Sequence, residues 1–303
     1  MEQLNNTTQE YESQVQKILK KMLIKRAENK NIISFLKSYN QKMSALSIEN
    51  CGTNVGITNV EGIARIVQAN FCRQRVCAIC AWRRQAKFLT QMNPVLQEIS
   101  ARGYEYIFCT LTIRNMPYTK LENAITELLK GYDRLLKRRK IKKAWSGAMR
   151  SLELTYNAQT NTFHPHIHML IAVKQDYFND KNLYISHEEL TEIWKECLQI
   201  NYNPQVDMRK VDNTEKATVE TFKYALKPSQ HTEAIKAFYF LLKGRRLISF
   251  SGIFAKVRKA LLCDDFENIL IDDIKGKSKK MTYTLYKFDV TGGVYKFYNT
   301  YTL

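Results

Sequence analysis

The sequence feature that most constrains the fold is the stretch FHPHIHMLIAV, residues 163–173, which holds three of the five histidines. Successive side chains of a β-strand point to opposite faces, so His164, His166 and His168 can share one face. The apolar residues that follow predict a strand buried within a sheet. Because Pro165 has no N–H to donate, we expect it to keep His164 out of the regular ladder.

Two further runs, YIFCTLTIR at 106–114 and SLELTY at 151–156, have the composition of strands. The intervening NAQTNT, residues 157–162, is rich in turn-forming residues and predicts a hairpin that makes SLELTY and HIHMLIAV antiparallel neighbours. Residues 119–145 carry a leucine-rich stripe at helical spacing. This order predicts an α+β fold, an antiparallel β-sheet with flanking helices on one face.

Other segments complete the expected secondary structure. Residues 11–46 predict one or two basic helices, and ENCGTNVGITN, residues 49–59, predicts a loop. Ser186 and Glu189 have the spacing of a capping box at the start of a helix. A further helix is expected over 214–227, before Pro228, and a hairpin over 281–301.

The paired histidines predict a metal site. Two imidazoles at i and i+2 on a strand can chelate one ion, and His166 and His168 have this spacing. Glu153, across the predicted hairpin, is the natural third ligand, and a carboxylate at a phosphate-binding site favours Mg²⁺ or Mn²⁺. The alternative is a row of polar residues on a solvated sheet face.

A second group is the stretch VETFKYALKPSQ, where Glu220, Tyr224 and Lys227 fall on one helical stripe. A tyrosine hydroxyl is a weak nucleophile, but it can attack a phosphodiester that a metal polarises. Taken alone, the same spacing is also typical of a solvated helix surface.

The cysteines form a third group. FCRQRVCAICAWRRQAKF contains Cys72, Cys77 and Cys80, and Cys51 precedes it, which together predict a structural Zn²⁺ site of the four-cysteine type. Free buried thiols are the alternative. The remaining cysteines, Cys109, Cys197 and Cys263, are expected to be lone core residues.

The charge balance indicates a polyanionic partner. The chain has 47 Lys and Arg against 29 Asp and Glu, a net charge of +18, and its 17 Tyr and 14 Phe suit the stacking of single-stranded bases. A membrane surface is the rival, but no segment is a clean basic amphipathic anchor. With no signal pattern and no apolar run near the roughly 20 residues that cross a bilayer, a cytoplasmic protein is expected.

The motifs occur in a fixed order: the cysteine run, FCTLT, SLELTYN, HPHIHML, KYALKPS and SGIFAKVRKAL. From about residue 51 to the C-terminus, the chain resembles the replication initiators of small rolling-circle plasmids of Gram-positive bacteria, within the HUH endonuclease superfamily. The resemblance implies that His166 and His168 bind the metal with Glu153. It also implies that Tyr224 is the nicking nucleophile, that Glu220 activates water for a second cleavage, and that Lys227 is the lysine beside the tyrosine.

The resemblance further implies an origin-specific DNA nickase that forms a 5′-phosphotyrosyl link and leaves a 3′-OH primer. DNA, a host helicase and a DNA polymerase are the implied partners, and the sequence leaves monomer and dimer open. Cys109 stands where an apolar residue is usual, and Ala78 where the cysteine cluster often has proline. Neither change touches the expected chemistry.

We therefore expect four segments: a basic helical extension at 1–50, a Cys-rich zinc-binding segment at 51–95, a catalytic domain at 100–230, and a C-terminal helix and hairpin region at 231–303. Three alternatives stay open, namely a transposase or relaxase of the same superfamily and a non-catalytic zinc-containing DNA-binding regulator. A zinc hydrolase is disfavoured because the sequence has no H-E-x-x-H motif.

Overall fold

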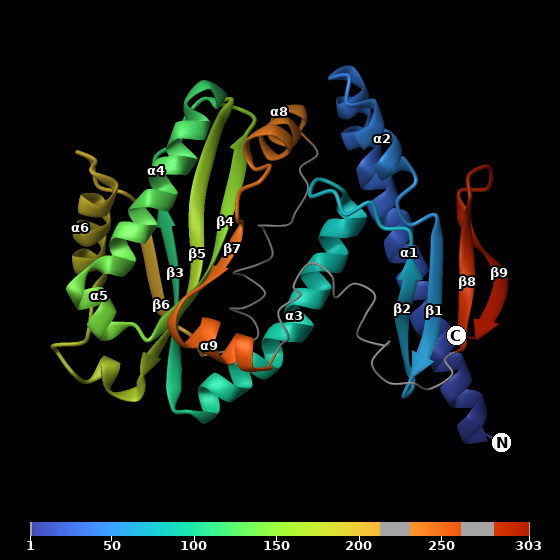
Figure 1. Cartoon of the computed structure of the whole chain (residues 1–303), viewed down its shortest axis with the longest axis horizontal. Coiled ribbons are helices and arrows are strands. Elements are labelled where there is room, and N and C mark those ends of the chain that lie inside the picture. The colour runs from blue at the N-terminus through green and yellow to red at the C-terminus, as the bar shows by residue number, and fades with distance from the viewer. Residues whose placement is uncertain (1, 213–230, 262–281, 303) are drawn as a thin grey trace. The chain divides into compact units, whose positions relative to one another are not determined.

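The computed structural model describes residues 2–212, 231–261 and 282–302, and the chain forms two compact units (Figure 1). One unit comprises Met1–Arg83 with Asp264–Leu303, and the other comprises Arg84–Cys263. Each unit contains one antiparallel sheet, and helices pack on both sheets. The α+β class predicted from the sequence is therefore confirmed.

The sheet of the second unit has five strands in the order β6-β3-β5-β4-β7. All neighbouring pairs are antiparallel. The predicted hairpin is confirmed, since β4 pairs with β5 from Gly147–Ala172 to Asn157–Thr162. The strands are β3 (Tyr104–Thr112), β4 (Gly147–Asn157), β5 (Thr162–Lys174), β6 (Val206–Lys210) and β7 (Ile248–Phe250).

Helices cover both faces of this sheet, not one face as expected. One face packs on α4 (Tyr118–Lys137), α5 (Arg139–Ala144) and α6 (His187–Leu198), and the other on α3 (Ala78–Ala101) and α9 (Gly252–Leu261). The reason lies in β5, where every residue from Met169 to Val173 is fully buried. A strand that is apolar at consecutive positions must be covered on both sides.

The expected helix over 119–145 is two helices. Arg138 adopts extended angles, φ −62° and ψ 136°, and so separates α4 from α5. The apolar stripe itself is as predicted, since Leu121, Ile125 and Leu128 are fully buried. The predicted cap of α6 is also present, because the Glu189 N–H donates to the Ser186 hydroxyl over 3.2 Å.

The expectation for His164 is wrong, because it pairs with Thr155 inside the β4–β5 ladder. Pro165 fits there for a local reason. On the other side of β5, the β3 pairing ends at Thr112–His166, and the next contact is the isolated bridge Met116–Phe163. Pro165 lies between the two, where its lack of an N–H leaves no ladder bond unmade.

The sheet of the first unit has four strands in the order β2-β1-β8-β9. The C-terminal hairpin is confirmed, but the segment expected to be a loop contains β1, which pairs with β2 on one side and with β8 on the other. The elements are α1 (Glu2–Ser38), α2 (Lys42–Glu49), β1 (Asn54–Val60), β2 (Ile63–Ala69), β8 (Thr282–Asp289) and β9 (Val294–Thr302).

Three shorter elements, η1 (Gln175–Phe178), α8 (Thr232–Lys236) and η2 (Ala237–Leu241), complete the second unit. The helix expected over 214–227 lies outside the described residues. Among the helices that the structure describes, none combines the length and the apolar character needed to span a bilayer.

Candidate metal centres

Glu153, His166 and His168 converge on one face of the five-stranded sheet. Glu153 on β4 lies directly opposite His166 on β5, and His168 follows two residues along the same strand. The Nε2 atoms of His166 and His168 lie 3.0 and 2.7 Å from the same oxygen, Oε2 of Glu153. The register of the hairpin thus brings together the three ligands predicted from the sequence.

The other ring nitrogen of each histidine is also held. His168 Nδ1 lies 3.0 Å from the hydroxyl oxygen of Thr110, its cross-strand neighbour on β3. His166 Nδ1 lies 3.0 Å from the carbonyl oxygen of His164. Metal-binding histidines ordinarily have such a second partner, which fixes the tautomer and ring orientation. Both Nε2 atoms are therefore directed toward the carboxylate.

The cluster is largely shielded from solvent. The side chains of Glu153, His166 and His168 are 4%, 9% and 12% exposed. Burial by itself raises the pKa of Glu153, but the hydrogen bonds and charges of the two histidines outweigh it and hold the pKa below its ordinary value. The carboxylate is thus kept in the ionised form that binds a cation.

His164 does not belong to the cluster, although its ring stacks on His166 with 5.1 Å between the centroids. Burial has the largest effect on the pKa of His164 and lowers it, and the charge of His166 lowers it further.

An aromatic layer adjoins His168, whose ring centroid lies 5.6 Å from that of Phe108. The Arg209 guanidinium in turn lies 4.7 Å from the Phe108 centroid. This places a cation on the sheet near the cluster.

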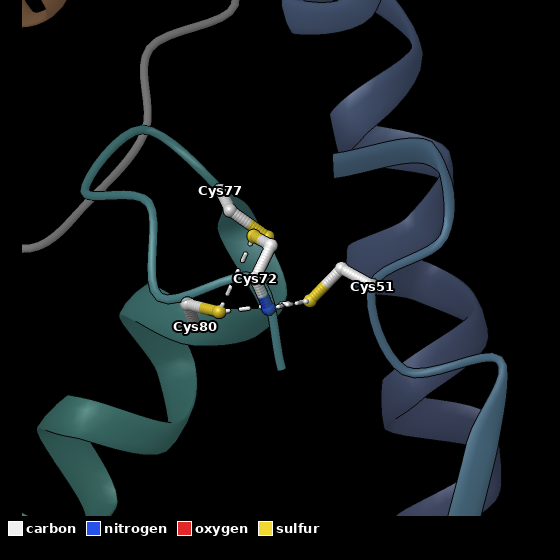
Figure 2. Close-up of side chains that lie close together, drawn as sticks. All are labelled: Cys51, Cys72, Cys77 and Cys80. Carbon is white, nitrogen blue, oxygen red and sulfur yellow. Dashed lines mark hydrogen bonds between the residues drawn. The ribbon is translucent and has the colours of Figure 1, made fainter. Parts of the chain in front are cut away.

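Four cysteines converge in the first unit (Figure 2). Their sulfur atoms all lie within 4.8 Å of one another, and Cys80 Sγ is 3.6 Å from both Cys51 Sγ and Cys72 Sγ. A tetrahedral zinc site with Zn–S bonds of about 2.3 Å requires sulfur separations of about 3.8 Å. The set Cys51, Cys72, Cys77 and Cys80 therefore fits Zn²⁺ in number, ligand type and spacing.

Asn29 on α1 supports the cysteine cluster from outside. Its side chain is almost fully buried, donates from Nδ2 to Cys77 Sγ over 3.4 Å, and accepts the N–H of Ala78 at Oδ1 over 2.7 Å. Hydrogen bonds from the other three thiols, Cys51 first, lower the pKa of Cys77. These donors stabilise a thiolate, which is the form that binds zinc.

The sequence did not reveal Thr110 or Asn29 as partners of the two clusters. Thr110 could have been found as the polar residue between the apolar run 106–109 and Leu111, once the β3–β5 register was known. Asn29 carries no such signal. Cys109 and Cys197 are buried, as expected of lone core cysteines. Cys263 and the predicted catalytic residues Glu220, Tyr224 and Lys227 lie outside the described residues.

Fold and clusters together define a class: a basic α+β protein with two separate candidate metal centres, one built from histidine and glutamate and one from cysteine. The family model described as "Replication protein" (Rep_1) matches residues 63–296, and the chain belongs to this family. The resemblance to plasmid rolling-circle initiators is therefore confirmed at the level of the protein family.

Curated relatives share the name "Protein rep". A "Protein rep" of Streptococcus pneumoniae is 35% identical over 234 residues, covering 73% of this chain and 73% of its own length. A "Protein rep" of Bacillus amyloliquefaciens is 34% identical, covering 68% of this chain and 69% of itself. A third, from Staphylococcus aureus, is 32% identical and is covered over 95% of its length. No solved structure has a significant match to the chain.

Proposed function

We propose that this protein initiates rolling-circle replication of a plasmid by nicking one DNA strand at the origin, with Tyr224 as nucleophile. The observation that carries the proposal is the convergence of two imidazoles and one carboxylate, each imidazole oriented through its second nitrogen. Membership of a replication-protein family provides the biological setting.

His166, His168 and Glu153 would hold a divalent cation. Two neutral imidazoles and one carboxylate leave open coordination positions on a six-coordinate ion such as Mg²⁺ or Mn²⁺. When bound, the cation would supply positive charge to the oxygens of the scissile phosphate. The apolar run behind the histidines anchors β5 in the core, so the ligands are held on a rigid strand.

Tyr224 would attack the phosphorus with its hydroxyl oxygen. The new bond joins the phenolic oxygen to phosphorus, the bond to the 3′ oxygen breaks, the phenolic proton leaves to solvent, and the 3′ oxygen takes up a proton from solvent. The products are a 5′-phosphotyrosyl link and a free 3′-OH. Lys227, on the same predicted helical stripe, would supply positive charge beside the phenolate.

Glu220 would act after one round of synthesis. A host polymerase would extend the 3′-OH behind a host helicase, in the cytoplasm where plasmids replicate. Glu220 would then remove a proton from a water molecule that cuts the regenerated origin. That cut frees a new 3′-OH, whose oxygen would attack the phosphotyrosyl phosphorus, join the ends of the displaced strand and release Tyr224. Because the second cut uses water rather than tyrosine, no new covalent link forms, and the cycle ends.

The test is a nicking assay on supercoiled plasmid that carries the protein's own origin, with Mg²⁺ or Mn²⁺ and with chelator. We expect nicking to require metal, to leave protein on the 5′ end, and to fall by roughly 10³-fold or more in Tyr224→Phe. Tyr184→Phe, which removes the hydroxyl of an exposed tyrosine, should nick normally.

Two outcomes would contradict the proposal. Binding without nicking under both metals would favour a DNA-binding regulator. Full nicking by Tyr224→Phe would assign the nucleophile to another residue.

A further inference from the structure

The most basic short segment of the chain is a structural feature that the proposed chemistry does not use. Six of the seven residues from Lys137 to Lys143 are cationic, and none is acidic. The segment covers the end of α4, the break at Arg138 and most of α5. A charge density of this kind favours the binding of a polyanion at any cations that have no internal partner.

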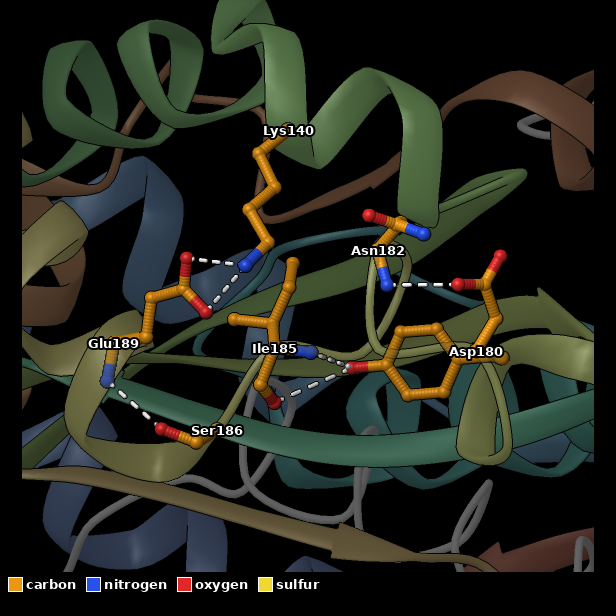
Figure 3. A network of polar contacts seen from close by, with 7 residues as sticks. Lys140, Asp180, Asn182, Ile185, Ser186 and Glu189 are labelled. Carbon is orange, nitrogen blue, oxygen red and sulfur yellow. Dashed lines mark hydrogen bonds and ion pairs between the residues drawn. The ribbon is translucent and has the colours of Figure 1, made fainter.

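Two of the six cations have internal partners. Lys140 Nζ lies 2.5 and 2.6 Å from the two carboxylate oxygens of Glu189 on α6 (Figure 3). Arg138 forms an ion pair with Glu196, also on α6, over 2.8 Å. Lys140 thus connects α5 to α6, and Arg138 connects the break before α5 to the same helix.

The other four, Lys137, Arg139, Lys142 and Lys143, form what we call the α5 patch. All four are exposed, and none forms an ion pair with any residue that the structure describes. On α5 the distribution follows from helix geometry. Successive residues are about 100° apart, so the three patch cations on α5, Arg139, Lys142 and Lys143, fall within an arc of about 100° on the side opposite the buried residues.

The buried side anchors the patch. Ile141 is 1% exposed and Ala144 is 5% exposed, and both belong to the main core of the second unit. Every apolar residue of α5 thus faces inward, and the outward surface offers cations alone. Protein–protein interfaces generally have an apolar centre, which this surface lacks. Binding of a phosphate backbone, in contrast, requires only positive charges on the surface.

We propose that the α5 patch binds the phosphate backbone of duplex DNA outside the nick site, independently of base sequence. Cations three and four residues apart on a helix have Cβ atoms about 5–6 Å apart, so several can reach neighbouring phosphates of one duplex. The inference rests on the proposed function only for the identity of the partner, which is DNA. It does not depend on the nicking chemistry, because the patch contains no metal ligand and no nucleophile.

The position of the patch separates it from the candidate metal centre. α5 ends three residues before β4 begins at Gly147. Glu153 is six residues further along β4, about 20 Å at the usual rise per residue. The patch also lies with α4 on the sheet face opposite to the one that carries α3. It therefore provides affinity for flanking DNA rather than contact with the scissile phosphate.

The test measures the salt dependence of binding by the full chain to a labelled duplex of mixed sequence, about 30 base pairs long, between about 50 and 200 mM salt. The variant carries Lys137→Gln, Arg139→Gln, Lys142→Gln and Lys143→Gln. Each lost phosphate contact should reduce the slope of log affinity against log salt by about 0.9, so we expect a reduction of two to four and a roughly 10- to 100-fold weaker affinity at low salt.

The matched control removes the same charge from four scattered, exposed lysines of the second unit, through Lys120→Gln, Lys174→Gln, Lys181→Gln and Lys243→Gln. We expect the slope of log affinity against log salt for this control to change by less than about 0.9, the effect of one phosphate contact. Equal effects of the two variants would mean that bulk charge alone matters and would overturn the proposal. An unchanged slope in the patch variant would do the same. Binding needs neither metal nor Tyr224, so the surface and the nicking chemistry can fail separately.

Discussion

At the residue scale, the two imidazoles of the histidine cluster are oriented by different means. His166 relies on a main-chain oxygen, that of His164, whereas His168 relies on the side chain of Thr110. Only the second can be removed by substitution without moving the strand. Thr110 is therefore the position at which the importance of ligand orientation can be measured.

We expect Thr110→Val, which removes the hydroxyl at nearly constant volume, to weaken Mn²⁺ binding by about tenfold, as loss of an outer hydrogen bond commonly does. Isothermal titration with Mn²⁺ measures this directly and does not depend on nicking. Thr110→Ser retains the hydroxyl and should bind Mn²⁺ almost normally. Equal affinities of wild type and Thr110→Val would show that the β5 backbone alone positions His168.

At the element scale, the start of β4 and the start of α9 meet through two glycines. A Cβ on Gly252 would overlap the Ser146 carbonyl oxygen, and Gly252 has φ +55°, in the left-handed region. A Cβ on Gly147 would lie 2.5 Å from the Ser251 carbonyl oxygen. From this close approach α9 continues over the face of the sheet that α3 also covers.

Gly252→Ala should therefore destabilise the second unit more than an ordinary glycine replacement does. The left-handed conformation alone costs about 1–2 kcal/mol, and overlap with the main chain adds to it. Gly244→Ala is the matched control, because Gly244 has φ +75° but no atom within 4 Å of an added Cβ. Urea unfolding of both variants compares the two costs, and equal losses would contradict a tight contact between β4 and α9.

The first unit pairs segments that lie far apart in the chain. β1 and β8 are antiparallel neighbours although more than two hundred residues separate them, and Tyr295 Oη donates to the Gly52 carbonyl oxygen over 2.5 Å, next to Cys51. The C-terminal hairpin is thereby part of the unit that contains the cysteine cluster.

At the scale of the whole molecule, the two candidate metal centres lie in different units with different sheets. Structural zinc contributes directly to folding free energy. We expect purified protein to contain one zinc per chain, and a strong chelator to lower the unfolding temperature of the first unit while leaving the second nearly unchanged. Calorimetry together with metal analysis tests this.

Cys77→Ser and Cys109→Ser form the matching pair of variants for the zinc experiment. Both cysteines are fully buried, but only Cys77 belongs to the four-sulfur cluster. Cys77→Ser should lose the zinc and the response to chelator, whereas Cys109→Ser should retain both. One zinc per chain in Cys77→Ser would contradict the four-cysteine site.

The sequence by itself determined the α+β class, the β4–β5 hairpin and the members of both candidate metal clusters. These depend on short-range patterns: alternation along a strand, turn residues between strands, and i, i+2 spacing of ligands. The helix break at Arg138 and the strand β1 were missed because local propensity is weak there and tertiary packing decides the conformation.

Only the tertiary structure decided how distant segments meet. It placed Thr110 beside His168 and Asn29 beside Cys77, and it joined β8 to β1. The physical reason is common to all three. Hydrogen-bond partners and strand neighbours depend on register and on packing between residues far apart in the chain, and neither leaves a periodic mark in the local sequence.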